Sequence, residues 1–362
     1  MSFDAPAWVE IDVAALRRNA ERLMAHTGRP LAPVLKANAY GLGAVPVAAA
    51  LEPLAPWGYC VATLDEAAQL RHGGVSRPVL VCPPLDEPQL ADAVALGVRP
   101  AIGRLELLEA WRRAGGGPWH LAVDTGMLRA GARWDRLHGW RNALREAPPE
   151  GAFTHFHSAD VADDTMADQE HRFAAALAEM PARPALVHTD NSAAAARRSP
   201  GTARGSFSRT GLFLYGVGTG PTAQLTPEPV VSLRARIVEI HEAAAGDTVG
   251  YAGAWTASGP RRIATVPVGY ADGYRRSLGN RGVALLRGHE VPIAGWVTMD
   301  MTMLDVTAAE GKVGDVVTLI GRDAETAGTG LGIERLASLA ECSPYELLVS
   351  LALRLPRRVV ST

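Results

Sequence analysis

Lysine is rare in this chain of 362 residues, in which Lys36 and Lys312 are the two lysines among 36 lysine and arginine residues. Where only positive charge is needed, the chain carries arginine. A lysine amine, unlike a guanidinium, can lose its proton and act as a nucleophile or proton carrier. Lys36 follows an apolar run and precedes Tyr40 and a glycine-containing turn. We interpret Lys36 as a reactive amine at a strand end, with a solvated surface lysine as the alternative, and Lys312 as a turn residue.

Polar side chains follow several other apolar runs, and their types suit an anionic ligand. They are Asp124 and Arg129, His155 and His157, His188 to Ser192, and Arg209 to Leu212. The Ser192 hydroxyl and the backbone N–H groups at Gly211 and Leu212 are candidate phosphate donors, and Ser192 is equally a candidate helix cap. A reactive lysine, a phosphate cradle and an arginine suggest pyridoxal phosphate, whose aldehyde bonds to an amine and whose ring withdraws electrons.

The elements that must position these residues alternate in a regular way. Short apolar runs and helix-like segments recur at intervals of roughly 25 residues, which is typical of strand–helix units and a parallel sheet. No Gly-x-Gly-x-x-Gly follows the first run, and eight units fit an α/β fold of the (β/α)8 TIM-barrel type, whose active sites lie at the carboxyl ends of the strands. The predicted strands are 31–36, 57–63, 78–82, 98–102, 119–124, 151–156, 185–190 and 206–214.

The composition and the predicted secondary structure change after Tyr215. A stretch rich in Gly, Thr and Pro leads into β-like segments at 231–241, 262–268, 283–286, 291–305 and 316–320, and then a helical pattern at 332–354 with Pro344 near a helix start. We predict a barrel domain over residues 1–226, a β-rich C-terminal domain over 227–362, and an N-terminal strand that is a candidate to join the second domain.

Composition argues against several classes of partner. A net charge of −2 provides no broad basic field for nucleic acid or an anionic membrane, and no apolar run is long enough to span a bilayer. The three cysteines, Cys60, Cys82 and Cys342, lack the spacing of a disulfide framework or a zinc site, so we expect small buried thiols in a reducing compartment. With no signal-peptide pattern at the N-terminus, these features predict a cytoplasmic enzyme.

Eight segments follow one another in a characteristic order: 33–41, 123–127, 154–156, 191–192, 215–216, 249–251, 269–273 and 299–300. Taken together, they resemble the signatures of the alanine racemase family, across about Trp8 to Arg357. The resemblance implies a pyridoxal 5'-phosphate enzyme that interconverts L- and D-alanine and serves D-alanine biosynthesis. It also implies a head-to-tail homodimer in which the partner's C-terminal domain completes each active site.

The resemblance also assigns roles to individual residues. Lys36 resembles the Schiff-base lysine and one acid/base group, and Tyr251 of the partner subunit resembles the opposing group. Racemisation needs a proton removed from one face of Cα and returned to the other, so two groups are a chemical requirement. Arg209 resembles the arginine that faces the pyridine nitrogen, and His155 resembles the residue that supports it. The phosphate ligands are resembled by Tyr40, Ser192, Gly211, Leu212 and Tyr345, and the clamp on the substrate carboxylate by Arg129 and the partner's Met299. Tyr270 and Asp300 resemble residues of the access passage and inner gate.

One departure from the family pattern concerns the substrate clamp. Many members carry a carbamylated lysine two residues before the aspartate of Asp-Thr-Gly, where it helps to hold the equivalent of Arg129. This chain has Ala122 there. We expect a bound anion, water or another carboxylate to take its place, with substrate affinity affected more than the reaction type.

Three alternatives remain open. A broader racemase acting on serine or larger side chains would keep the fold, because an apolar pocket rejects an added hydroxyl only about 10²-fold. A non-catalytic pyridoxal-phosphate carrier would keep the barrel and lack the second domain. A metal-dependent hydrolase would use His155 and His157 on one face of a strand, with His188, Asp160 and Asp163 as further ligands; the main prediction is that no metal is bound.

Overall fold

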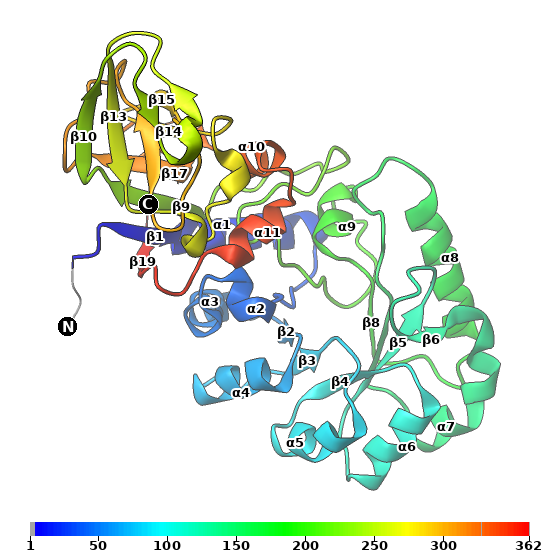
Figure 1. Cartoon of the computed structure of the whole chain (residues 1–362). Helices are drawn as coiled ribbons and strands as arrows, with labels where there is room; N and C mark the ends of the chain where they lie inside the picture. The colour runs from blue at the N-terminus through cyan, green and yellow to red at the C-terminus, as the bar shows by residue number, and fades with distance from the viewer. Residues whose placement is uncertain (1–3, 327, 362) are drawn as a thin grey trace.

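Parallel strands form the wall of a barrel in the first part of the chain, in a computed structural model that describes residues 4–326 and 328–361. Each strand pairs in parallel with the next, so all carboxyl ends open at one mouth. The strands, in spatial order, are β2 (Tyr59–Val61), β3 (Val79–Val81), β4 (Arg99–Ile102), β5 (His120–Asp124), β7 (Gly151–Phe153) and β8 (Leu186–His188), with β6 (Ala132–Arg133) pairing beside β5 (Figure 1). The predicted (β/α)8-type fold is confirmed.

The barrel closes through two segments that form isolated bridges instead of regular strands. Leu31 bridges to Ser208 and Val34 to Cys60, both in parallel. The predicted strands 31–36 and 206–214 were therefore too long. Pro33 has no N–H to donate to a ladder, and the chain after Gly211 folds into turns in which the Leu214 N–H donates to the Gly211 carbonyl oxygen (2.8 Å).

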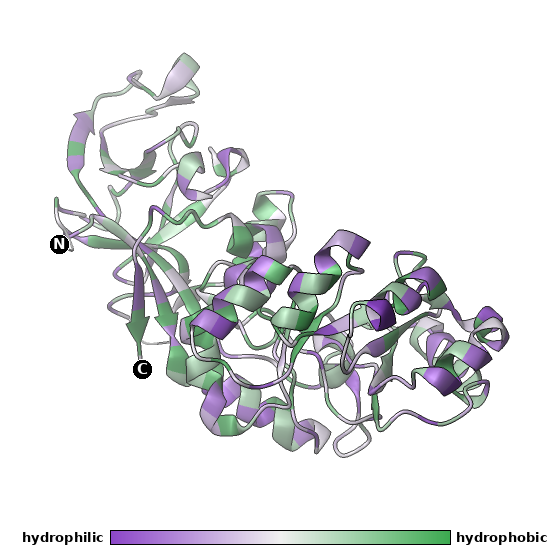
Figure 2. Ribbon diagram, turned by 90° about the horizontal axis from the view of Figure 1, so that it is seen from below, coloured by the Kyte–Doolittle hydropathy of each residue, from purple (hydrophilic) through white to green (hydrophobic). Residues whose placement is uncertain are grey.

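Helices cover the outside of the barrel (Figure 1). They are amphipathic, as α6 illustrates: Leu108 and Trp111 are buried while Arg112 and Arg113 are exposed. Figure 2 shows the same mixture of hydrophilic and hydrophobic residues along these helices. They are α3 (Ala44–Leu51), α4 (Leu64–His72), α5 (Leu90–Ala95), α6 (Leu105–Arg113), α7 (Arg141–Glu146), α8 (Thr165–Ala178) and α9 (Ser192–Arg197), with 3-10 turns η1 (Glu52–Leu54), η2 (Glu87–Gln89) and η3 (Trp134–Trp140). The segment α2 (Lys36–Tyr40) is instead a left-handed turn at the pocket.

The second part of the chain is rich in β-strands. Its largest sheet has the order β15-β14-β17-β9-β1-β19, with β18 beside β17, and smaller sheets are β10-β13-β16 and β11-β12. The N-terminal strand β1 pairs antiparallel with β9 and parallel with β19, so it lies in this sheet and not in the barrel. The strands are β1 (Ala7–Asp12), β9 (Val231–Arg236), β10 (Glu239–Ala243), β11 (Thr248–Val249), β12 (Trp255–Thr256), β13 (Arg261–Val266), β14 (Val283–Leu286), β15 (His289–Pro292), β16 (Thr302–Asp305), β17 (Val316–Arg322), β18 (Gly330–Leu331) and β19 (Arg357–Val360), with 3-10 turns η4 (Tyr251–Gly253), η5 (Tyr270–Asp272) and η6 (Arg276–Leu278).

Two predicted β segments are each divided in the structure. The segment 231–241 splits into β9 and β10, because two consecutive N–H groups bond to different sheets. The Ile237 N–H donates to the oxygen of Asp315, just before β17 (2.9 Å), and the Val238 N–H donates to the oxygen of Thr265 on β13 (2.9 Å). The segment 291–305 splits into the end of β15 and β16, with a loop between them.

Helices α1 (Val13–Thr27) and α11 (Pro344–Ser350) lie between the barrel and the sheets, with α10 (Ile333–Leu339) beside them (Figure 1). Pro344 is the first residue of α11, as the sequence predicts, and the Ser343 side chain caps this helix. No helix in residues 4–326 or 328–361 is long and apolar enough to cross a bilayer.

Candidate active site

A pocket of about 380 Å³ opens at the carboxyl ends of the barrel strands. Val61, Asp124 and Thr154, which end or follow β2, β5 and β7, contribute to its wall. The sequence-predicted residues that line the pocket are Lys36, Arg129, His155 and Arg209, together with Ala122. Lys36, Arg129 and Arg209 therefore share the pocket with one carboxylate, Asp124, so the pocket suits an anionic ligand.

Lys36 begins a strained turn. The next residues, Ala37 to Tyr40, all have positive φ, between 52° and 55°, at a cost of roughly 1–2 kcal/mol for each residue without glycine. Glu66 on α4 supports this conformation, because its carboxylate accepts the Ala37 N–H (2.6 Å) and the Ala62 N–H (2.7 Å). The turn brings Lys36 to the pocket and Tyr40 to the side of Gly211.

Arg209 is held by a chain of buried hydrogen bonds that crosses the barrel interior. Its Nη1 donates to His188 Nδ1 (2.6 Å), His188 Nε2 contacts His120 Nδ1 (2.8 Å), and His120 Nε2 contacts Glu150 Oε2 (3.2 Å). Burial lowers the pKa of both imidazoles, which favours their neutral forms. Since a guanidinium only donates, each neutral imidazole then accepts at Nδ1 and donates at Nε2. All the hydrogen bonds of this series can therefore form with donation in one direction, from Arg209 to the Glu150 carboxylate.

Backbone carbonyl groups hold the rest of the Arg209 guanidinium. Its Nη2 donates to the Thr154 oxygen (2.7 Å), and its Nη1 also reaches the His188 oxygen (3.0 Å). The guanidinium carbon lies 4.9 Å from the centre of the Phe153 ring. Burial lowers the pKa of Arg209, but a guanidinium starts so high that it stays charged. Arg209 is therefore a fixed hydrogen-bond donor at the pocket wall.

His155 contributes a neutral imidazole to the pocket. Burial, followed by the charges of Arg209 and Arg129, lowers its pKa to about 3. At neutral pH this side chain can donate or accept a hydrogen bond without adding a further positive charge to a cationic pocket.

A second group of sequence-predicted residues forms a cradle at the edge of the mouth. Ser192 starts α9, and its Oγ accepts the Gly211 N–H (3.0 Å). A Cβ atom on Gly211 would lie 2.8 Å from Tyr40 Oη, so glycine is needed for this close approach. The Tyr40 ring lies 6.5 Å from the ring of Tyr345 on α11. Leu212 follows Gly211 in the buried turn.

Arg129 reaches the pocket from the loop after β5. The Asp124 carboxylate shapes this loop by accepting the Gly126 N–H (3.0 Å) and the Leu128 N–H (3.1 Å). Within residues 4–326 and 328–361, no carboxylate lies within ion-pair distance of Arg129. Ala122, beside it in the pocket, supplies only a methyl group.

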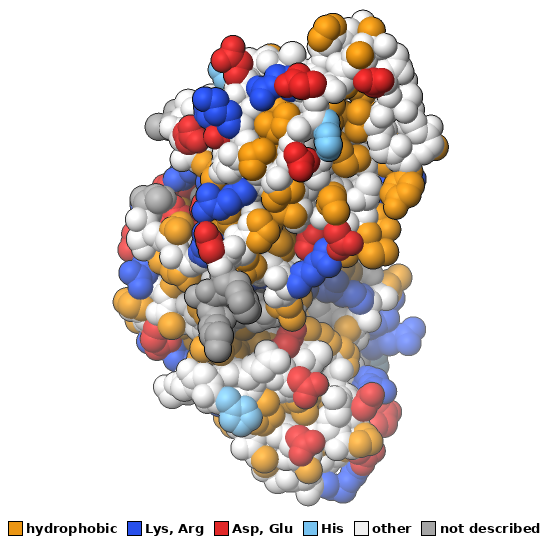
Figure 3. All heavy atoms as spheres, turned by 60° about the vertical axis from the view of Figure 1, so that its left-hand side comes forward, with side chains coloured by type: hydrophobic (Ala, Val, Ile, Leu, Met, Phe, Trp, Pro, Cys, Tyr) orange, Lys and Arg blue, Asp and Glu red, His pale blue; other side chains and the backbone are white. Residues whose placement is uncertain are grey.

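The remaining predicted residues do not reach this pocket. Tyr251, Tyr270, Met299 and Asp300 belong to the β-rich part, and none of them lines the barrel pocket of their own chain. Tyr251 is 75% exposed and Met299 54% exposed, which is unusual for large apolar side chains. Figure 3 shows one face on which hydrophobic side chains gather over the β-rich part among charged ones.

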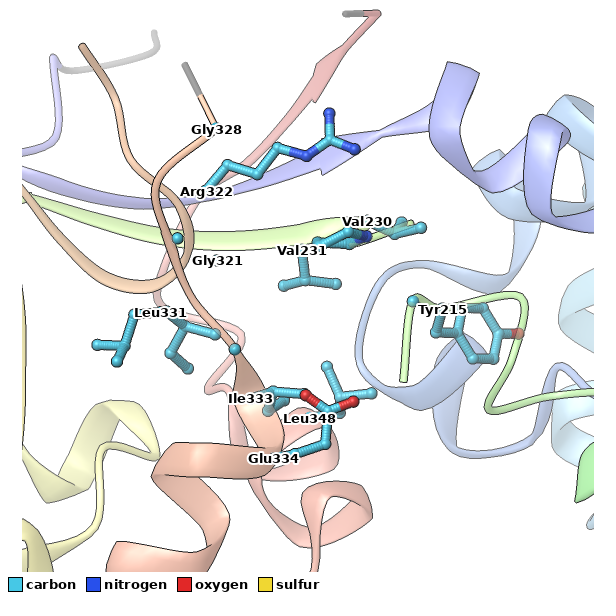
Figure 4. Close-up of a pocket in the computed structure, with 15 residues that line it drawn as sticks. Tyr215, Val230, Val231, Gly321, Arg322, Gly328, Leu331, Ile333, Glu334 and Leu348 are labelled. Atoms are coloured by element: carbon cyan, nitrogen blue, oxygen red, sulfur yellow. The ribbon is translucent and has the colours of Figure 1, made fainter. Parts of the chain in front are cut away.

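A second cavity, of about 280 Å³, lies where the barrel meets the large sheet. Figure 4 shows Tyr215, Leu348 and Ile333 around it, with Arg322 and Glu334 at its edges. Arg322 pairs with Glu228 (3.4 Å), and Glu334 accepts the Gly218 N–H (2.7 Å). Its wall contains no lysine or histidine, so we place the chemistry in the barrel pocket.

The residues proposed for a metal site are not brought together. His188 bonds to Arg209 and His120, whereas His157 bonds to Ser158 Oγ (2.6 Å) on the surface. Across the described ranges 4–326 and 328–361, no group of three or more His, Cys, Asp or Glu side chains is arranged to hold a metal ion. The three cysteines are free thiols; Cys60 is buried, but Cys82 and Cys342 are only partly buried, so the expectation of burial was wrong for these two.

Comparisons with known proteins agree with this architecture. Two family models match in succession, the alanine racemase N-terminal domain over residues 11–219 and the C-terminal domain over residues 230–359. The chain belongs to the alanine racemase family. An alanine racemase of Sorangium cellulosum is 37% identical over 376 residues, covering 97% of this chain and 98% of that protein.

Solved structures of family members are closely similar to this chain. The alanine racemase of Bacillus anthracis with bound L-Ala-P has a TM-score of 0.89 at 31% identity, covering 99% of this chain and 96% of that one. The alanine racemase of Bartonella henselae with covalently bound pyridoxal phosphate has a TM-score of 0.89 at 27% identity, covering 98% of this chain and 100% of that one. The expectation of an alanine racemase family member, drawn from the sequence segments, is thus confirmed.

Sequence reasoning missed several residues that shape the site. His120 starts β5 inside an apolar run, and a polar residue in such a run was the available signal. Glu66 follows Thr63 by three residues, which is the capping-box spacing that indicates a helix start. Its second contact, with Ala37, joins two distant segments and left no signal in the sequence.

Proposed function

We propose that this member of the alanine racemase family is a pyridoxal-phosphate-dependent enzyme that interconverts L- and D-alanine. The observation that carries the proposal is the position of Lys36 at the barrel mouth, in one pocket with Arg129, His155 and Arg209. The names of its relatives and the bound groups of two solved structures support the same assignment.

The residues present fit the cofactor. The Gly211 N–H and the Ser192 hydroxyl, with Tyr40 and Tyr345 beside them, would hold the phosphate in a cradle that a Cβ on residue 211 would fill. The Leu212 backbone would contribute to the same cradle. When bound, pyridoxal phosphate supplies an aldehyde that joins covalently to an amine and a ring that withdraws electrons from the substrate's Cα.

Two groups would move the proton. The Lys36 amine would hold the cofactor and transfer a proton on one face of Cα, and the Tyr251 hydroxyl of a second copy of the chain would act on the opposite face. Tyr251 is a candidate for this role because its side chain is 75% exposed and is absent from its own chain's pocket.

Arg209 and His155 would set the electrostatics. Arg209 keeps its protons and would donate to the pyridine nitrogen, so this nitrogen would stay largely unprotonated and side reactions such as transamination would be limited. His155, with its pKa lowered to about 3, would remain neutral and support Arg209 on the side of Tyr251.

Arg129 would bind the substrate carboxylate, with the Met299 backbone of the second copy. Because Ala122 leaves Arg129 without a carboxylate partner among the described residues, we propose that a small anion or water fills the space beside Ala122. The guanidinium would then be held less firmly, which would raise KM for alanine more than it lowers kcat.

A head-to-tail homodimer would complete each pocket. Residues 227–362 of one copy would cover the barrel of the other, with Tyr270 and Asp300 lining the access passage and gate. The exposure of Tyr251, Tyr270 and Met299 supports this arrangement, because apolar groups of this size are usually covered. We also place the enzyme in the cytoplasm, where its free thiols would stay reduced and D-alanine would be available for biosynthesis.

The proposal is tested with purified protein supplied with pyridoxal phosphate. L-Alanine, D-alanine and L-serine are incubated separately, and the enantiomers are separated by chiral chromatography. Borohydride reduction followed by peptide mass spectrometry should locate the cofactor on Lys36, and Lys36→Ala should abolish both the adduct and the conversion of alanine. A serine rate above the alanine rate would favour the broader racemase. An adduct without conversion of any amino acid would favour the carrier.

A further inference from the structure

Two surface segments of the β-rich part are joined to each other by their backbones. They are the 269–273 turn, which contains η5, and the 298–301 loop, which precedes β16. The Tyr270 N–H donates to the Thr298 oxygen (2.9 Å), and the Ala271 N–H to the Met299 oxygen (3.0 Å). A Cβ on Gly269 would lie 2.3 Å from both of these oxygens, so the two segments touch. Between them they carry Tyr270, Met299 and Asp300.

Arg354 joins the same two segments through its side chain. Its Nε and Nη2 donate to the two oxygens of Asp272 (2.6 and 2.9 Å), and Nη2 also donates to Asp300 (2.8 Å). Asp272 is buried and in turn accepts the Gly269 N–H (2.9 Å). One guanidinium therefore fixes the turn through Asp272 and the loop through Asp300.

We propose that Arg354 is a positioning residue for racemisation that acts in trans, on the active site of the other subunit. The inference rests on the proposed function, and in particular on the proposed dimer. The side chains that Arg354 orders are exposed and absent from the pocket of their own chain, so fixing them has no use for that pocket. A loop displaced by about 1 Å would cost the partner's site roughly 10²-fold in activity.

A competing route would act in cis. Arg354 follows α11, which carries Tyr345 beside Tyr40 at its own barrel mouth. The same region contacts the 269–273 turn, because the Ala352 N–H donates to the Asp272 oxygen (3.1 Å). Loss of Arg354 would then disturb the phosphate cradle of its own chain. The experiment must separate these two routes.

The first measurement compares Arg354→Gln with a matched control, Arg335→Gln. Arg335 pairs with Glu290 through two nitrogens in the same part of the chain, and both arginine side chains are 50% exposed. The Arg335–Glu290 pair is exposed and contributes little to fold stability. Loss of Arg354 instead leaves the buried Asp272 carboxylate without its cation, so thermal unfolding of both variants is measured alongside activity. We expect kcat/KM for alanine to fall roughly 10²-fold in the first variant and to stay within about twofold in the second. Arg354→Lys keeps the charge but cannot contact the two aspartates through two nitrogens, and it replaces the glutamine variant in this comparison if that variant does not fold.

The decisive measurement uses two hybrid dimers, each purified through two different tags. In one hybrid, a Lys36→Ala chain is paired with an Arg354→Gln chain, so the working barrel receives an intact Arg354 from its partner. In the other, a Lys36→Ala, Arg354→Gln chain is paired with a wild-type chain, so the working barrel receives the altered face. The proposal expects the first hybrid to equal a Lys36→Ala/wild-type hybrid and the second to show the full loss.

A readout independent of activity is hydrogen exchange on the protein without cofactor. Peptides covering 269–273 and 298–301 should exchange faster in Arg354→Gln than in Arg335→Gln, while the peptide covering β13 should not change. Equal exchange in both variants, equal impairment of both hybrids, or impairment of the first hybrid alone would each overturn the proposal. Failure of the proposed function is distinguishable, because wild-type protein would then lack racemisation or the Lys36→Ala/wild-type hybrid would be inactive.

Discussion

The two groups of residues assigned to the active site differ in how they are placed within one chain. In the barrel, Arg209 is 5% exposed and donates hydrogen bonds through both Nη1 and Nη2, and it belongs to a series of bonded side chains that ends at Glu150. In the β-rich part, Tyr251 is 75% exposed. The barrel residues are therefore organised within their own chain, whereas the role that we propose for Tyr251 requires a second chain.

The strained turn that begins at Lys36 lies in the barrel part, whereas the exposed large apolar side chains assigned to the site lie in the β-rich part. Ala37 to Tyr40 keep positive φ values because backbone and Glu66 hydrogen bonds fix that turn inside the chain. The exposed residues of the β-rich part are instead presented on turns such as η4 and η5. Both patterns depart from what stability alone favours, which is expected at functional sites.

The largest expected effect tests whether the two regions act across subunits. Tyr251→Phe should lower kcat/KM about 10²–10⁴-fold and leave thermal stability unchanged, because the side chain is exposed. Mixing the impaired Tyr251→Phe chains with inactive Lys36→Ala chains should raise activity well above that of either variant, through hybrid dimers that contain one intact site. If a confirmed hybrid shows no recovery of activity, both residues serve the pocket of their own chain, and the β-rich part does not act across subunits.

The next effect tests the buried region by stability. His188→Phe leaves the buried His120 Nδ1 without its donor and removes one of the two acceptors of Arg209 Nη1, which keeps the backbone oxygen of residue 188. This should lower the free energy of unfolding by about 1–3 kcal/mol. Tyr270→Phe on the exposed region should change it by less than about 0.5 kcal/mol. Urea unfolding of both cofactor-free variants measures the contrast, and equal losses would contradict it.

A smaller effect tests the cofactor cradle. Gly211→Ala places a methyl group 2.8 Å from Tyr40 Oη. The resulting overpacking should cost about 1–3 kcal/mol, or roughly 5- to 150-fold in affinity for pyridoxal phosphate. Gly139→Ala, where nothing lies within 4 Å of the added Cβ, is the control. Fluorescence titration of both variants would exclude this cradle if their affinities were the same.

The last prediction concerns the pH dependence of stability. Burial lowers the pKa of His155 to about 3 and also lowers the pKa values of His120 and His188. Below about pH 6.5 the unfolded chain takes up protons that the folded barrel does not, so stability should fall as pH falls, by up to about 1.4 kcal/mol per pH unit for each imidazole. For His155 this loss extends down to about pH 3.

Unfolding free energies measured between pH 7 and pH 5 check this prediction. His155→Asn should reduce the slope by up to one proton. An unchanged slope in this variant would show that the burial of His155 is not its cause.

The elements of the barrel were largely predictable. The apolar runs at 98–102 and 119–124 became β4 and β5, because strands buried on both faces of a parallel sheet are apolar throughout. The runs at 31–36 and 206–214 contain apolar residues too, but Pro33 and the turn after Gly211 limit their pairing to isolated bridges. The division at Ile237 and Val238 was not predictable, since it depends on which sheet receives each N–H.

The sequence by itself determined the class of fold, the single candidate amine at Lys36 and the ordered segments that mark the family. It did so because lysine scarcity, strand–helix periodicity and short motifs are local properties of the chain. Only the tertiary structure decided that Arg209, His188, His120 and Glu150 form one path and that Tyr251 lies outside its own pocket. His120 and His188 are 68 positions apart, and such contacts arise when strands pack around a common core, which no local pattern records.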